Sequence, residues 1–311
     1  MAQATTPIPL GTALRGSAAR RRRERIVQTV LLCAGLASIA ISAFIVFTLV
    51  FEAWSFITRV DLSALNSAGW APRRGLFDIP TLLIGTFLVS AIAMLVAAPV
   101  GLFTAIFLSE YATPRVRSFV KPILEILAGI PSIVLGFFAI AVISPQVVQR
   151  INPQAPGFNI LAASIAVGIL SIPLVASVSE DAMRAVPRSL REASYGLGAR
   201  RLTTSLRVVF PAAISGIVAA LILATSRAIG ETMVVALAAG ASGSGARSWD
   251  PFGVGQTLTA AMASLAIGSD QVRGDSLAFP SLFFLGAVLF AITLLLNIIG
   301  DAFVRRTRQR Y

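Results

Sequence analysis

Two charged residues, Arg227 and Glu231, interrupt the apolar segment LATSRAIGETMVVAL. A charge at the centre of a bilayer costs about 2.5 to 3.5 kcal/mol, so both side chains are expected to face a protein interior or a watery cavity. Their spacing of four positions predicts that both lie on one face of a helix. Gly230, between them, allows a kink or the close approach of a ligand. The segment therefore predicts a charged site inside a membrane span.

The guanidinium of Arg227 suits an oxyanion, because it presents a planar fork of donors whose attraction strengthens in a medium of low dielectric constant. Glu231 would neutralise Arg227 when the cavity is empty and would accept a hydrogen bond from a protonated oxyanion. The alternative is a permanent ion pair that only ties helices together. In that case the same two residues would keep the same spacing without touching a solute.

A second polar group follows Glu125, where Gly129, Pro131 and Ser132 predict a bend that frees backbone groups. Glu125 is expected to act in a gate or in packing, with an arginine of an inside loop as a possible partner. Ser132 is a candidate contact along the same path.

The elements that must position these residues are membrane helices. Of the 311 residues, 56% are hydrophobic and 13% are charged, against about 25% charged in an average soluble domain. Histidine is absent, and the single cysteine, Cys33, excludes an intrachain disulfide. We expect an all-α, polytopic membrane protein with about six spans of about 20 residues each. The expected spans are Ile26–Phe51, Thr81–Leu108, Pro122–Ile143, Ile160–Val178, Ala212–Ala239 and Ser281–Ile299.

The distribution of positive charge predicts the orientation, because cytoplasmic loops carry an excess of arginine and lysine. It places both termini in the cytoplasm, with residues 1–25 as a basic tail and residues 26–311 as the membrane domain. A nucleic-acid role for the tail would need a folded basic module or interleaved aromatic residues, and neither occurs. The inside segments carry Arg15 and the clusters Arg20–Arg25, Arg115–Lys121, Arg184–Arg207 and Arg305–Arg310, while the outside segments hold only Arg59, Arg73, Arg74, Arg150, Arg247 and Arg273.

Two outside segments, 52–80 and 240–280, are long and rich in turn-forming residues, and we expect them to offer a docking surface for an external partner. Within the second, Val254–Ile267 is too short to span the bilayer. It would lie at the interface or re-enter the membrane.

The inside segment 180–211 is polar and has the pattern of two short helices. Pro187 can begin a helix, Gly196 and Gly198 allow a sharp reversal, and Pro211 closes the segment before the next span.

This segment resembles the signature loop of ABC importer permeases, which reads E-A-A, three residues, G, nine residues, I-x-L-P. Ser194 stands in place of the second alanine, and Val208 and Phe210 in place of isoleucine and leucine. The resemblance implies that the loop inserts into a groove of a separate ATP-hydrolysing subunit, where Gly198 allows the turn and Glu192 braces it. The coupling residues assigned in this way are Glu192, Ala193, Ser194, Gly198 and Pro211.

Four further motifs, IPTLLIGTFLVS, AIFLSEYA, EILAGIPSIVLGFF and RAIGETMVV, resemble the phosphate-specific permeases of bacterial Pst importers, of the PstC type more than the PstA type. The resemblance implies the ABC importer type I permease fold in the bacterial plasma membrane. It also implies a PstA-type second permease, a PstB-type ATPase dimer and a PstS-type external phosphate-binding protein, with Arg227, Glu231, Gly230, Ser132 and Glu125 along the phosphate path.

No P-loop sequence occurs, so the chain itself is not expected to be an enzyme or to hold a cofactor, and ATP and Mg²⁺ belong to the ATPase partner. Three alternatives remain open at this point. The first is an ABC permease for another oxyanion such as sulfate or molybdate. The second is an ion-coupled secondary transporter, and the third is a receptor-like membrane protein through which no solute passes.

Overall fold

The computed structural model describes residues 18–67, 69–240, 247–267 and 277–307. Most of the expected basic tail, Arg273 and the last arginines lie outside these residues. The chain divides into two compact units, 1–51 and 52–311. The first contains most of α2 (Ala18–Ile57), and the most apolar stretch of 18 residues within this helix buries none of its side chains. A helix that is apolar on all sides suits a lipid environment.

Five helices of the described chain are long and apolar enough to cross a membrane. A sixth candidate is a pair of helices, Arg201–Ala212 and Ile214–Ile229, that bends by 71°. The expected all-α, polytopic architecture is therefore confirmed. The five helices are Arg22–Ile57, Ile79–Tyr111, Ser132–Ile151, Ile160–Arg184 and Ala278–Arg306.

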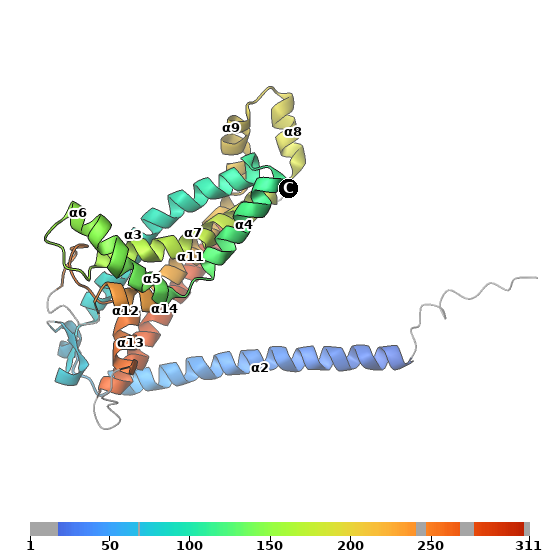
Figure 1. Cartoon of the computed structure of the whole chain (residues 1–311). Coiled ribbons are helices and arrows are strands. Elements are labelled where there is room, and N and C mark those ends of the chain that lie inside the picture. The colour runs from blue at the N-terminus through green and yellow to red at the C-terminus, as the bar shows by residue number, and fades with distance from the viewer. Residues whose placement is uncertain (1–17, 68, 241–246, 268–276, 308–311) are drawn as a thin grey trace, which may run out of the picture. The chain divides into compact units, whose positions relative to one another are not determined.

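The centre of the second unit is the pair α3 (Ile79–Ile106) and α7 (Ile160–Arg184), which pack along one another (Figure 1). Gly168 makes this close approach possible, because an added Cβ would lie 2.9 Å from both the Ala93 carbonyl oxygen and the Val96 Cβ. Small residues at such contacts allow membrane helices to pack closely without a hydrophobic driving force.

The expected span Pro122–Ile143 is not one helix. The chain forms α4 (Pro114–Ala128), breaks, and resumes as α5 (Ser132–Phe138), the π-helical segment η4 (Ala139–Val148) and α6 (Gln149–Ile151). Pro131 has no amide hydrogen to donate to the preceding turn, while the Gly129 amide bonds back to the carbonyls of Glu125 and Ile126. The predicted bend is confirmed, but the span lies further along the chain than expected.

The expected span Ala212–Ala239 is also wrong as a single helix. Its first part, α11 (Ile214–Ile229), ends at Gly230, and α12 (Met233–Ala238) begins after a non-helical link. The Glu231 carbonyl in this link accepts a hydrogen bond of 2.7 Å from the Thr259 hydroxyl of α13 (Leu258–Ile267). A distant side chain therefore stabilises the break, and Arg227 and Glu231 do not share a helix face.

The segment after α7 folds as α8 (Arg188–Gly196) and α9 (Arg201–Thr204), two short helices that project together from one end of the bundle (Figure 1). Gly198 has a φ of +79°, a left-handed conformation that glycine adopts without steric cost. The chain continues through the π-helical segment η5 (Ser205–Val209) and α10 (Phe210–Ala212) to the bend before α11.

The expected outside segment 52–80 contains the 3₁₀ helices η1 (Leu62–Asn66) and η2 (Pro72–Arg74) and an antiparallel hairpin of β1 (Trp70–Ala71) and β2 (Leu76–Phe77). Phe56 packs against Phe77 and against Phe284 of α14 (Ala278–Thr307), with ring centroids 5.0 and 5.1 Å away. These aromatic contacts fix the hairpin on the helices.

Candidate functional site

A pocket of about 200 Å³ lies among α4, α7 and α11. It brings together two residues that the sequence analysis singled out separately, Glu125 and Arg227. It also contains two charged residues that the analysis did not assign to the site, Lys121 and Glu180. The remaining lining residues are Leu124, Ala128, Pro173, Leu174, Ser177 and Val178.

Arg227 lies in the last turn of α11 and is exposed in this chain. Within the described residues its side chain forms neither an ion pair nor a hydrogen bond, so the permanent pair with Glu231 is not present. The Glu231 carboxylate instead accepts a long hydrogen bond of 3.5 Å from the Val234 amide at the start of α12. The pocket thus holds a guanidinium whose donors are available to a solute or to another subunit.

Glu125 is exposed and, among the residues that the structure describes, forms no ion pair, so the expected partner arginine is not there. Ser132 is half-buried at the start of α5, and Gly230 caps α11. Glu231, Gly230 and Ser132 do not line the pocket. Of the five residues expected along the path, the structure therefore gathers Arg227 and Glu125 and leaves the other three outside the pocket.

Glu180 is the centre of a charged cluster that sequence reasoning missed. Its side chain is 1% exposed and lies within ion-pair distance of Arg117 Nε at 3.3 Å, Lys121 Nζ at 3.6 Å and Arg184 at 3.6 Å. Neither carboxylate oxygen has a hydrogen-bond partner among the described residues. The sequence feature that could have revealed this cluster is an acidic residue directly after an apolar span, in a segment otherwise rich in arginine.

A second missed residue, Arg191, anchors α8 to the bundle. Its guanidinium contacts the buried carboxylate of Glu110 at 2.9 Å and donates to the carbonyls of Met183 at 2.8 Å and Val186 at 2.7 Å. Glu110 belongs to the π-helical segment η3 (Phe107–Tyr111) that follows α3. The contacts of Arg191 therefore tie α8 to the ends of both central helices, α3 and α7.

The predicted coupling residues occupy the projecting loop. Glu192 and Ala193 are exposed on α8, and the Ser194 and Thr204 hydroxyls are hydrogen-bonded at 2.8 Å across the reversal at Gly198. Glu192 forms no ion pair or hydrogen bond within the described chain, so the structure does not show it bracing the turn. Pro211 lies in α10, immediately before the 71° bend.

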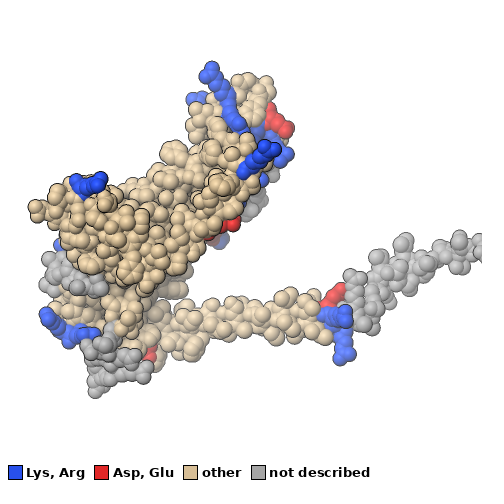
Figure 2. All heavy atoms as spheres, viewed as in Figure 1, with Lys and Arg blue, Asp and Glu red and all other residues tan. Residues whose placement is uncertain are grey.

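The tip of this loop also carries an apolar side chain that is almost fully exposed to solvent. Leu197 is 90% exposed. Figure 2 shows positive side chains gathered over the same end of the unit, whereas most of the visible surface along the helices is uncharged.

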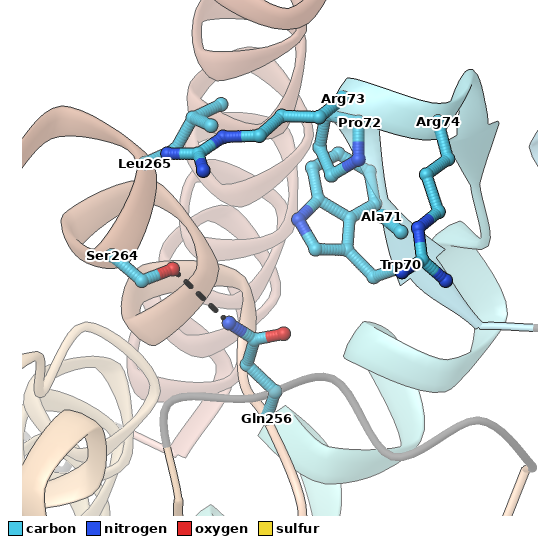
Figure 3. A pocket seen from close by; sticks show the side chains of 8 residues that line it. All are labelled: Trp70, Ala71, Pro72, Arg73, Arg74, Gln256, Ser264 and Leu265. Atoms are coloured by element: carbon cyan, nitrogen blue, oxygen red, sulfur yellow. Dashed lines mark hydrogen bonds between the residues drawn. The ribbon is translucent and has the colours of Figure 1, made fainter. Parts of the chain in front are cut away.

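A second pocket, of about 360 Å³, forms where the two expected outside segments meet. Trp70, Arg73 and Arg74 come from the hairpin, while Gln256 and Ser264 come from the region of α13. Figure 3 shows Arg73 extending toward Leu265, and the Gln256 amide donates to the Ser264 hydroxyl at 3.2 Å. In the part of the chain that the structure describes, no group of three or more His, Cys, Asp or Glu residues is arranged to hold a metal ion.

Apolar helices around a charged pocket, with a helical loop projecting from one end, are the features expected of a membrane permease. The chain belongs to the family of binding-protein-dependent transport system inner membrane components, whose model matches residues 97–309.

Individual relatives refine this assignment. The chain is 33% identical over 233 residues to the probable ABC transporter permease protein YqgH of Bacillus subtilis, covering 74% of each chain. It is 31% identical over 275 residues to the phosphate transport system permease protein PstC of Mesorhizobium japonicum, covering 83% of this chain and 82% of that one. These similarities confirm the resemblance to PstC-type permeases.

The fold is also similar to that of a solved ABC transporter. A chain of the MetNI methionine ABC transporter, in inward facing conformations, matches with a TM-score of 0.52 and 20% identity, covering 74% of this chain and 94% of that one. The likeness supports the expected importer permease fold.

Proposed function

We propose that the chain is a permease subunit of an ATP-driven phosphate importer and forms the translocation path together with a second, PstA-type permease. The observation that supports this most directly is the exposed guanidinium of Arg227, which lines a pocket in a candidate span and has no partner among the described residues. Such a charge is costly in a bilayer unless a watery cavity or another protein surface faces it. A path between two permeases provides both.

The chemistry of the pocket favours phosphate. Arg227 and Lys121 supply donors and positive charge to an oxyanion. Glu125 supplies a carboxylate that can accept a hydrogen bond from a protonated phosphate oxygen. Sulfate carries no such proton at neutral pH, so the carboxylate would only repel it. In this assignment Glu125 takes the role that the sequence suggested for Glu231.

Motion would come from the loop that contains α8 and α9. We assign this loop to a PstB-type ATPase dimer, which would bind ATP and Mg²⁺ and cover the exposed Leu197. Closure of the ATPase subunits would move α8, and the Arg191–Glu110 pair would carry this movement to α3 and α7 as a rigid body. Both termini are then cytoplasmic, and a PstS-type protein delivers phosphate to the opposite side.

The test is Arg227→Gln in the complex with its partner subunits, reconstituted in proteoliposomes. Removing a hydrogen bond to a charged group costs about 1.5 to 3 kcal/mol, so uptake of radiolabelled phosphate is expected to fall at least tenfold while the complex still assembles. Arg150→Gln is the matched control, because Arg150 is exposed, lies outside the pocket and, within the described chain, bonds only to Gln146 of the adjacent turn. Unchanged uptake by Arg227→Gln, or loss of assembly together with uptake, would contradict the proposal. Competition by sulfate equal to that by unlabelled phosphate would contradict the choice of substrate.

A further inference from the structure

The buried carboxylate of Glu180 is held in an unusual way. Three cations from two helices surround it at 3.3 to 3.6 Å, yet neither oxygen accepts a hydrogen bond from the part of the chain that the structure describes. Charge-assisted hydrogen bonds to carboxylates are normally about 2.7 to 2.9 Å long. The attraction is therefore electrostatic without directed bonds, and the cations retain donors that a different anion could use.

The position of the cluster is equally informative. Glu180 and Lys121 line the same pocket as Arg227. Glu180 lies in the last turns of α7, and Arg117 and Lys121 lie in the first half of α4. In the proposed orientation these are the cytoplasmic ends of the helices. An anion that leaves Arg227 toward the cytoplasm would meet this cluster next.

From these observations we propose that the Glu180 cluster is a second oxyanion site on the transport path, occupied by the Glu180 carboxylate when no substrate is there. This inference rests on the proposed function. A phosphate group has four oxygens and can contact several cations at once, whereas the carboxylate reaches them with two. The arriving anion displaces the carboxylate from Lys121 and Arg184, and the return of the carboxylate expels the anion into the cytoplasm. No covalent bond changes.

The cluster is also joined to α8 by continuous polar contacts. Arg117, besides facing Glu180, donates to the carbonyls of Leu108 at 3.1 Å and Ser109 at 3.4 Å. The next residue of that segment is Glu110, which holds Arg191 of α8. Movement of α8 would therefore change how many cations surround Glu180. This arrangement links release of the anion to the ATPase cycle.

Two substitutions separate this proposal from a purely structural role. Glu180→Gln removes the competing negative charge and leaves the cations, so the cluster should bind phosphate more tightly. Lys121→Gln removes one cation, so the cluster should bind phosphate more weakly. If the ion pairs only fasten α4 to α7, both variants break the same fastening and should change the behaviour of the complex in the same direction.

The measurement is the internal phosphate concentration that halves ATP-driven uptake of external labelled phosphate into proteoliposomes. We expect this concentration to fall at least fivefold for Glu180→Gln and to rise at least threefold for Lys121→Gln. Arg184→Gln should act like Lys121→Gln. If Glu180→Gln does not assemble, Asp181→Asn takes its place, because it removes the exposed carboxylate that lies 3.4 Å from Lys121 Nζ and should lower this concentration. Asp301→Asn, which removes a carboxylate paired with Arg305 elsewhere on the chain, is the matched control and should change nothing.

Shifts of the same sign in Glu180→Gln and Lys121→Gln, or no inhibition by internal phosphate in any of the proteins, would overturn the second site. These results would leave the role of Arg227 intact, because that role is tested by the loss of uptake in Arg227→Gln. A wild-type complex that takes up no phosphate would overturn both proposals. Equal inhibition by internal sulfate would show that the second site accepts oxyanions without selecting phosphate.

Discussion

The ion pair between Glu110 and Arg191 is expected to hold α8 in place, and Arg191→Met tests it. The Glu110 side chain is 4% exposed and that of Arg191 is 17% exposed. Removing one partner of a buried pair costs about 3 to 5 kcal/mol, because the other charge stays buried without compensation. The substitution also removes the two hydrogen bonds to the Met183 and Val186 carbonyls.

If about 3 kcal/mol of this cost falls on the local opening of α8, the opening equilibrium rises by roughly two orders of magnitude. Hydrogen exchange of the amides in Arg188–Gly196, measured by mass spectrometry on the intact complex, should accelerate by that factor, whereas exchange in α7 should change little. Phosphate-stimulated ATP hydrolysis should persist, but uptake per ATP should fall, because movement of the loop no longer reaches α3.

Arg188→Met is the control, since Arg188 is exposed on the same helix and forms no ion pair within the described chain. It should change local stability by less than about 0.5 kcal/mol. The double variant Glu110→Gln, Arg191→Met should recover about 1 to 3 kcal/mol of the loss, because no unpaired charge remains. Unchanged exchange of α8 in Arg191→Met, or additive effects in the double variant, would refute the reasoning.

Two further substitutions test particular features of the fold. Gly198→Ala places a Cβ on a residue with φ of +79°, which costs about 1 to 2 kcal/mol and should reduce phosphate uptake. Gly196→Ala is the control and should be tolerated, because Gly196 does not have a positive φ. Equal uptake by the two variants would argue against the left-handed turn. Thr259→Val removes the hydroxyl that donates to the Glu231 carbonyl, so the complex should lose about 1 kcal/mol of stability, measured as a lower unfolding temperature. Thr293→Val should have a smaller effect, because among the described residues the Thr293 hydroxyl bonds only within its own helix. The reverse order would contradict this role of Thr259.

The sequence predicted the features that depend on local chemistry. Gly198 turns the loop because of its own conformational freedom, and Pro131 interrupts a helix because of its missing amide hydrogen. Long apolar segments likewise predicted α3 closely, and they predicted the apolar parts of α7 and α14, which both continue past the expected ends. These elements follow from residues that are near one another in the chain.

The sequence could not predict features that depend on distant contacts. The break after Gly230 is stabilised by Thr259, which lies 28 residues further along, so the spacing of Arg227 and Glu231 suggested a helix face that does not exist. Arg191 contacts Glu110, which lies 81 residues away in the chain. From the sequence, the charge of Arg191 was interpreted only as a sign of membrane topology. The cluster around Glu180 also depends on distant contacts, because two of its three cations come from α4, a different helix.

The central claim is that an oxyanion passes through the pocket that contains Arg227, and the most direct measurement is protection of a cysteine placed in its wall. Ser177 lines the pocket, and Cys33 is the only native cysteine, so Ser177→Cys in a Cys33→Ser chain gives a single reporter. In the assembled complex this cysteine should react with an anionic methanethiosulfonate reagent, and phosphate should slow the reaction at least threefold. A cysteine that is inaccessible in every state of the ATPase cycle, or that reacts at the same rate with and without phosphate, would contradict the account.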